Sequence, residues 1–144
     1  MNALLFLDFD GVVHPRTRGT FELLPMLEDW LVLNTHVDVV ISSTWRLEYS
    51  LAHLREGFLC PELHPRIIDV TPDLPAHAGP VRQAEIEHWI AAHGRRTSRR
   101  AALDDDATLF QKGCPWLVQT EYTAGLTPQH LAALSRLIGD PRPL

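Results

Sequence analysis

The sequence predicts an α/β fold: a three-layer, doubly wound, Rossmann-like domain with a mostly parallel five-stranded sheet. Short apolar runs alternate with amphipathic stretches, the runs are apolar along their whole length, and three of them end in polar residues. Strands of this kind are typical of a parallel sheet that is covered on both faces. We expect a single domain over residues 1–144, because a chain of this length with 45% apolar residues suits one core.

The predicted elements follow from this alternation. The apolar runs predict strands at residues 3–9, 37–42, 66–70, 100–103 and 116–119. The amphipathic stretches predict helices at residues 22–34, 45–57 and 81–93, with a last helix from residue 128. Thr127 is a suitable N-cap for that last helix and Pro128 a suitable first helical residue.

The first predicted strand ends in two carboxylates, Asp8 and Asp10, followed by Gly11. Residues two apart in a strand point to the same side, so both carboxylates project together. Gly11 allows a sharp turn and a close approach to a ligand. Carboxylates in an apolar setting need cations or hydrogen bonds, and Mg²⁺ prefers hard oxygen donors. An Asp can also form an aspartyl-phosphate, and the alternative interpretation is an ordinary turn after a core strand.

Two more predicted strands end in polar residues. Residues 42–44 are Ser-Ser-Thr, and residues 104–106 are Asp-Asp-Asp. In open α/β sheets, ligands bind beyond the carboxyl ends of the strands. The three strand ends together therefore predict a catalytic site for a metal ion and a phosphate.

Composition excludes several classes of protein. The net charge is −5 and the pI about 5.8, so the chain as a whole is not an electrostatic binder of nucleic acid. Cys60 and Cys114 lack the spacing of a metal site. No apolar run approaches the roughly 20 residues of a membrane span, and nothing resembles a signal peptide. We therefore expect a cytoplasmic protein with no membrane partner.

These motifs resemble those of the haloacid dehalogenase (HAD) superfamily of aspartate-nucleophile phosphohydrolases. Its first, second and fourth motifs are similar to residues 8–12 (DFDGV), 39–43 (VVISS) and 101–105 (AALDD). The small HAD domains found alone or in bacterial RNA-repair proteins are similar at residues 43–46 (STWR), 103–106 (LDDD) and 125–127 (GLT). The resemblance covers most of the chain.

The resemblance implies roles for the acidic residues. Asp8 would be the nucleophile and a ligand of Mg²⁺. Asp10 would be the general acid and then the general base, with its backbone carbonyl also on the metal. Asp105 would be the third ligand, with Asp104 orienting or supplementing it. The alternative for these residues is a solvated turn after an edge strand.

The resemblance also implies a phosphate-binding group. Ser43 and Thr44 would hold the phosphoryl oxygens, with Ser42 as the alternative because strand registers are uncertain by a residue or two. The hydroxyls of Ser42 and Ser43 could also cap the following helix, and the two roles could coexist. Arg82, near the start of the helix before the acidic strand, would neutralise the phosphate and the nucleophile, and Lys112 is its competitor.

Other basic residues fall into two groups. The run at residues 95–100 leads into the amino end of a strand, which predicts a solvated turn opposite the catalytic loops. His14, Arg16, Arg18 and Arg46 follow the first two motifs and could form a rim for further phosphates, although a satisfied loop histidine is the favoured interpretation of His14.

The intervals between the motifs are too short for the cap domain that covers many HAD sites. An open site admits bulky substrates such as nucleic-acid ends, unless oligomerisation closes it. We therefore expect a Mg²⁺-dependent phosphomonoesterase that acts through an aspartyl-phosphate on a terminal phosphate of a nucleic acid or nucleotide. The alternatives are a phosphatase of a small metabolite or phosphoprotein, and a non-catalytic module that binds phosphate and metal.

Overall fold

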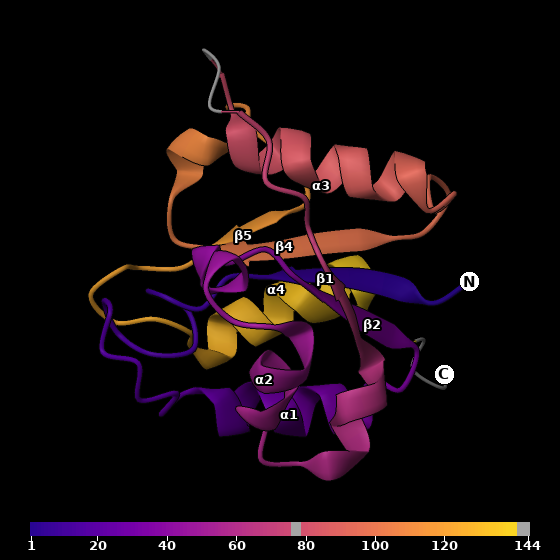
Figure 1. Ribbon diagram of the computed structural model, residues 1–144. Coiled ribbons are helices and arrows are strands. Elements are labelled where there is room, and N and C mark those ends of the chain that lie inside the picture. Colours follow the sequence, from indigo (N-terminus) through magenta and orange to yellow (C-terminus); the bar gives the residue numbers. More distant parts are fainter. Residues whose placement is uncertain (76–78, 141–144) are drawn as a thin grey trace.

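The computed structural model describes residues 1–75 and 79–140, which form a parallel sheet between two layers of helices (Figure 1). The strands are β1 (Ala3–Leu7), β2 (Val37–Ile41), β3 (Ile67–Val70), β4 (Arg100–Asp104) and β5 (Leu117–Gln119). Their order is β3-β2-β1-β4-β5, and each neighbouring pair is parallel. The predicted fold class is confirmed, with a sheet that is wholly parallel.

The register aligns the carboxyl ends of the three central strands. Leu7 at the end of β1 pairs with Ile41 of β2 and with Leu103 of β4. The next backbone hydrogen bonds continue this alignment, because the Asp8 N–H donates to the Leu103 carbonyl and the Ser42 N–H donates to the Leu7 carbonyl. The residues that follow these strands are therefore brought to one edge of the sheet.

Helices cover both faces of the sheet. On one face lie α1 (Leu24–Leu33), α2 (Leu51–Glu56) and α4 (Pro128–Ile138), and on the other lies α3 (Val81–Ala92) (Figure 1). Alternation along β1 supplies both cores: Leu5 and Leu7 pack with the three-helix face, whereas Leu4 and Phe6 pack with α3. Trp89 of α3 meets the Phe6 ring edge-on at 5.8 Å.

One predicted helix is divided in two. The stretch at residues 45–57 forms the 3₁₀ helix η1 (Thr44–Leu47) and then α2. The division lies at Ser50, whose hydroxyl accepts the His53 N–H at 3.1 Å and so begins a new helix. Two short 3₁₀ helices, η2 (Pro61–Arg66) and η3 (Ala107–Leu109), were not predicted, because segments this short carry little periodicity.

The start of α4 agrees with the prediction. Thr127 is the N-cap residue and Pro128 the first helical residue. The side chain of His130 completes the cap, because its Nδ1 accepts the Thr127 N–H at 2.9 Å.

Both described ends of the chain lie at the amino ends of the strands. Asp140 packs against the residues that lead into β2, where its N–H donates to the Asn34 side chain and its carboxylate accepts the Thr35 N–H. Arg95, in the basic run, donates to the carbonyl of Asn2 just before β1. The basic run therefore lies at the other end of the strands from Asp8, Ser42 and Asp104.

No cap domain is inserted within the described residues. The interval between β1 and β2 holds a loop and α1, and the interval between β2 and α3 holds η1, α2, η2 and β3. Among the described helices, none is long and apolar enough to cross a bilayer.

Candidate active site

Three carboxylates meet at the carboxyl edge of the sheet. Asp8 follows β1, Asp104 ends β4 and Asp105 follows it. One oxygen of each side chain lies within 4.8 Å of the others. Asp8 and Asp104 are buried, with Asp104 only 1% exposed, and Asp105 is half-buried. We call these three residues the acid cluster.

Gly11 fits the turn next to the acid cluster for a steric reason. Its φ is +71°, a conformation that residues with a side chain rarely adopt. A Cβ at this position would lie 2.8 Å from Cγ of Asp105. The Thr120 hydroxyl donates to the Gly11 carbonyl at 2.7 Å and fixes the turn from the other side. The predicted close approach is therefore made to a carboxylate of the cluster.

The acid cluster holds its protons more tightly than ordinary carboxyls. Burial, followed by the charge of Asp104, raises the pKa of Asp8 well above its usual value. Burial raises the pKa of Asp104 to about 6, although the Asp106 N–H and Arg82 act in the opposite direction. Burial also raises the pKa of Asp105. The ionised form of the acid cluster is therefore stabilised by a nearby positive charge, which a bound cation would supply at neutral pH.

The residues of the acid cluster fit a divalent metal ion. Carboxylate oxygens are the hard ligands that Mg²⁺ prefers. Asp104 Oδ1 accepts the Asp106 N–H at 3.0 Å, whereas the buried Oδ2 has no hydrogen-bond partner among the described residues. An unpartnered buried carboxylate oxygen is costly without a cation. Asp8, Asp104 and Asp105 would hold the ion.

Arg82 lies beside this cluster and Lys112 does not. Arg82 is buried in the first turn of α3 and donates to the carbonyl of Ser42. Its Nε lies 3.7 Å from Asp104 Oδ2 and has no hydrogen-bond partner among the described residues. Lys112 is exposed on the loop after η3. Of these two basic residues, Arg82 is therefore the one that lies next to Asp104 at the end of β4.

Arg46 is a correction to the expected basic rim. Its side chain is 2% exposed and bonds to Glu85 at 2.9 Å, so it cannot reach a phosphate outside the protein. Its guanidinium also donates to four backbone carbonyls in the loops after β2 and β3, those of Ser42, Ser43, Thr71 and Pro72. Burial lowers the pKa of Arg46. The guanidinium satisfies carbonyls that would otherwise be unpaired, which is a structural role.

Glu85 was not singled out from the sequence. It is buried on α3, and its carboxylate bonds to Arg46 and lies 3.7 Å from Arg82 Nη1. It also accepts the Leu74 N–H at 3.0 Å. Its place in the sequence, three residues after Arg82, could have indicated that the two side chains lie close together, since residues three apart share a helix face. Glu85 links the two arginines behind the strand ends.

The three hydroxyl residues after β2 differ in their surroundings. Ser43 is buried and its hydroxyl accepts the Trp45 N–H at 3.2 Å, which confirms the capping role. Ser42 is also buried, and its backbone carbonyl accepts from Arg82 and Arg46. Thr44 is exposed at the start of η1. In this contact the Ser43 hydroxyl oxygen is the acceptor, so the hydroxyl proton stays available for donation.

Asp10 is held outside the acid cluster. Its Oδ1 lies 2.7 Å from His14 Nε2 and accepts the indole N–H of Trp45 at 3.2 Å. His14 is fully buried and bonds to Asp10 through Nε2, while its Nδ1 has no hydrogen-bond partner among the described residues, so it is a buried loop histidine rather than a part of the rim. The bond between Trp45 and Asp10 could not be predicted from local patterns, because it joins residues 35 apart.

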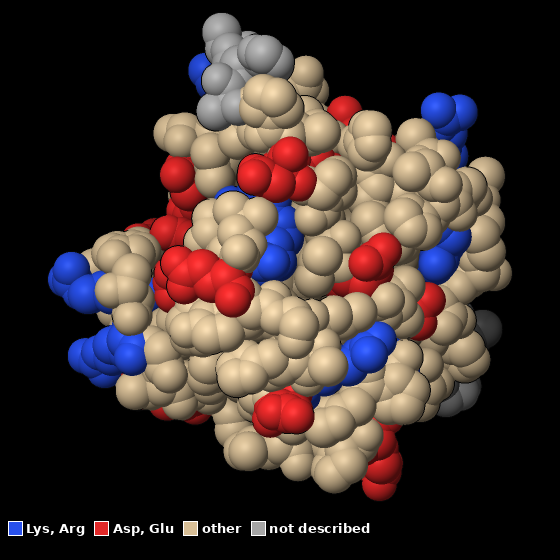
Figure 2. All heavy atoms as spheres, in the orientation of Figure 1, with Lys and Arg blue, Asp and Glu red and all other residues tan. Residues whose placement is uncertain are grey.

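The remaining basic residues after β1 are exposed. Arg16 and Arg18 lie on the loop between β1 and α1, and Figure 2 shows basic side chains at the left, where Figure 1 places that indigo loop. Arg16 lies over the exposed Tyr122 ring, with its Cζ 5.9 Å from the ring centre. We call Arg16, Arg18 and Tyr122 the rim, and within it Arg18 pairs with the exposed Glu22 at 3.3 Å.

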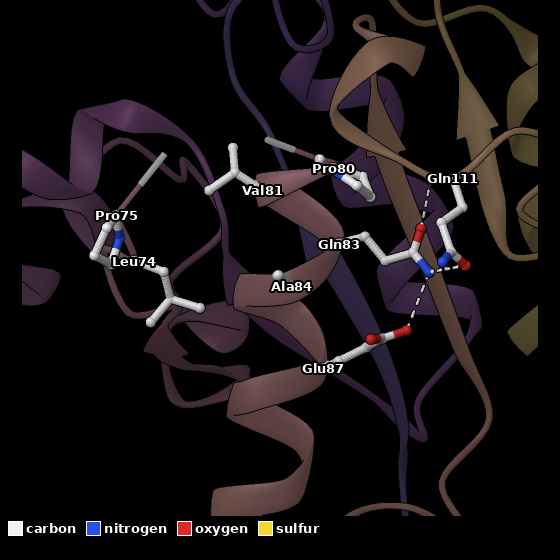
Figure 3. Close-up of a pocket in the computed structure, with 9 residues that line it drawn as sticks. Leu74, Pro75, Pro80, Val81, Gln83, Ala84, Glu87 and Gln111 are labelled. Atoms are coloured by element: carbon white, nitrogen blue, oxygen red, sulfur yellow. Dashed lines mark hydrogen bonds between the residues drawn. The ribbon is translucent and has the colours of Figure 1, made fainter. Parts of the chain in front are cut away.

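A separate cavity of about 450 Å³ lies beside the start of α3 (Figure 3). Its polar groups bond to one another: the Gln83 amide donates to the Glu87 carboxylate and to the Gln111 side chain, and accepts the Gln111 N–H. None of the three carboxylates of the acid cluster lines it.

Comparison with known families agrees with the fold and the cluster. The family model of the HAD domain in Swiss Army Knife RNA repair proteins matches residues 4–131. That range runs from β1 into α4 and contains the acid cluster and Arg82. The chain is thus a domain of the HAD superfamily, and within it belongs to the family of HAD domains of Swiss Army Knife RNA repair proteins. Neither a curated protein nor a solved structure gave a significant match.

Proposed function

We propose that this protein is a Mg²⁺-dependent phosphomonoesterase that acts through an aspartyl-phosphate on Asp8, with a terminal phosphate of a nucleic acid or nucleotide as substrate. The observation that carries the proposal is the acid cluster with Arg82 beside it, at the carboxyl edge of the sheet in a HAD domain. Phosphoryl transfer chiefly needs positioning and positive charge around the transferred group, and this edge supplies groups for both.

The reaction has two steps in this proposal. An Asp8 oxygen attacks phosphorus, the bond from phosphorus to the leaving oxygen breaks, and Asp10 gives that oxygen its proton. A water molecule then attacks phosphorus and gives a proton to Asp10, and the bond to Asp8 breaks. The products are an alcohol and inorganic phosphate, and both carboxyl groups return to their first state.

The other residues supply charge and orientation. Arg82 offers a guanidinium whose Nε makes no hydrogen bond to the described residues, and Ser43 and Thr44 are proposed to hold phosphoryl oxygens. Mg²⁺ on the acid cluster would supply positive charge that offsets the charge of the phosphoryl group and favours ionised Asp8. Lys112 is not assigned a role, because it is exposed beyond η3.

The proposed substrate class rests on the family and on the rim. The family is named for RNA repair proteins. Exposed Arg16 and Arg18 suit backbone phosphates, and an exposed Tyr122 ring suits a stacked base. The described chain holds no inserted cap that would limit the size of the substrate.

The test is phosphate release from a panel of substrates by the purified protein with Mg²⁺. The panel contains an aryl phosphate, mononucleotides, sugar phosphates and oligonucleotides phosphorylated at the 3′ or 5′ end. We expect turnover that EDTA abolishes and that Asp8→Asn lowers by several orders of magnitude without unfolding the protein. Near wild-type turnover by the Asn variant would refute the covalent mechanism, and no turnover of any substrate by the wild type would refute the function.

A further inference from the structure

We propose that His14 and Trp45 are positioning residues that fix the orientation of Asp10 and leave its Oδ2 atom as the one that transfers the proton. This inference rests on the proposed function, in which Asp10 is the general acid and base. It adds which atom of Asp10 acts and which side chains hold that atom in place.

Both positioning residues bind the same oxygen of Asp10. His14 Nε2 lies 2.7 Å from Oδ1, and the Trp45 indole nitrogen donates to Oδ1 from 3.2 Å. The two donors come from different parts of the chain, the loop after β1 and the helix η1. Two bonds to one oxygen fix the plane of the carboxylate. Oδ2 makes no hydrogen bond to any described residue, and the side chain as a whole keeps 29% of its surface exposed.

The surroundings of His14 determine which ring nitrogen carries hydrogen. Its Nδ1 is buried and has no hydrogen-bond partner among the described residues. A hydrogen on Nδ1 would be a buried donor without an acceptor, which is costly, whereas a hydrogen on Nε2 has Oδ1 as its acceptor. The Trp45 indole can only donate. Oδ1 therefore accepts from both residues.

Aromatic packing holds the two donors in place. The His14 ring meets Phe21 edge-on at 5.2 Å, and Trp45 meets Phe21 at 5.2 Å and Phe9 at 5.7 Å. Phe21 adopts a φ of +50°, a left-handed backbone conformation that is strained for a residue with a side chain. A strained residue in the middle of this packing indicates that the position of its ring is required.

This arrangement assigns the proton in both steps. With the lone pairs of Oδ1 engaged by two donors, the proton of the acid form resides on Oδ2. In the first step that proton passes from Oδ2 to the leaving oxygen as its bond to phosphorus breaks. In the second step Oδ2 takes a proton from the attacking water. His14 and Trp45 do not exchange protons with the substrate.

The test compares two substrates that differ in their need for an acid. An alkyl phosphate needs protonation of its leaving oxygen, whereas 2,4-dinitrophenyl phosphate does not. We expect His14→Phe, which keeps a ring but removes the donor, to lower kcat/KM for the alkyl ester by about 10–100-fold, which is part of the roughly 10²–10⁴-fold that general acid catalysis contributes. The same variant should lower kcat/KM for the activated ester less than about threefold, because kcat/KM reports only the first step.

Two further variants complete the experiment. His14→Gln offers an amide N–H and should restore most of the lost kcat/KM with the alkyl ester. The control is His88→Phe, at an exposed position of α3, which should leave kcat/KM unchanged for both substrates. Equal losses with both esters, or no loss with either, would overturn the positioning role while leaving the proposed function intact. A wild type inactive on both esters would instead overturn the proposed function and this inference with it.

A spectroscopic measurement tests the contact without turnover. Two-dimensional ¹⁵N–¹H correlation of the histidine rings distinguishes the two tautomers, and the signal missing from His14→Phe identifies His14. We expect the Nε2–H tautomer. The Nδ1–H tautomer would contradict the hydrogen bond to Asp10 and overturn the inference whatever the activity.

Discussion

Replacing Asp104 by Asn should stabilise the metal-free protein, although it removes a residue of the proposed site. Asn keeps the shape of the side chain and an oxygen that can accept the Asp106 N–H. It removes a buried negative charge that lies close to Asp8 and Asp105. The cost of that charge is visible in the pKa of Asp104, which burial raises to about 6.

The size of the effect follows from this pKa. The rise from 3.8 to about 6 is roughly two units, and one unit corresponds to about 1.36 kcal/mol, so ionised Asp104 lowers the free energy of unfolding by about 3 kcal/mol. The folded state holds the proton more tightly than the unfolded state. The penalty is therefore absent below about pH 4, grows as the pH rises, and is complete above about pH 6. This figure already includes the attraction to Arg82. Because Asn does not reproduce every contact of the carboxyl group, we expect a gain of about 1–3 kcal/mol at pH 8.

Urea unfolding in EDTA, followed by tryptophan fluorescence at pH 4 and pH 8, measures this gain. The variant and the wild type should have similar free energies of unfolding at pH 4 and differ at pH 8. Mg²⁺ should stabilise the wild type at pH 8 more than the variant, because binding to the folded state adds stability by mass action. Asp29→Asn, at an exposed carboxylate of α1, is the control and should change the free energy of unfolding little at either pH. A variant less stable than the wild type at pH 8 in EDTA would refute the reasoning.

Three further outcomes are expected. Arg82→Ala should lower kcat/KM at least 100-fold and Lys112→Ala less than about twofold in steady-state assays, and the reverse ranking would move the phosphate-neutralising role to Lys112. An end-phosphorylated oligonucleotide should equal or exceed the matching mononucleotide in kcat/KM, with an advantage that shrinks as salt rises; a salt-independent preference for the mononucleotide would favour a small-metabolite phosphatase. Replacing Arg16 and Arg18 together by Ala should remove that advantage and leave the mononucleotide rate within about twofold, and an unchanged advantage would exclude the rim from binding.

The fold could be predicted because its signals are local. Apolar runs, turns and a helix start such as Thr127 are each encoded within a few residues. The acid cluster followed from one additional rule, that parallel strands in register bring their ends to one edge. The predicted ends of the strands were wrong by one or two residues, since Asp8 and Ser42 lie just beyond β1 and β2.

The contacts that could not be predicted join distant segments. Arg46 follows the second motif and was expected to be exposed, yet carbonyls from the loop after β3 and the carboxylate of Glu85 surround its guanidinium. The bond from Trp45 to Asp10 depends in the same way on the packing of two loops. Neither contact has a spacing or a periodicity that the sequence displays. They became visible only with the positions of the side chains.

The placement of the two described ends of the chain has a practical consequence. Asn2 and Asp140 lie at the amino edge of the sheet, and the acid cluster lies at the carboxyl edge. The five residues of β1 separate the two edges by about 16 Å at roughly 3.3 Å per residue. A tether attached beside Asn2 or Asp140 would therefore anchor the protein to a bead, a surface or a fused protein with the acid cluster facing away. Long oligonucleotides should reach the immobilised protein as freely as they reach it in solution.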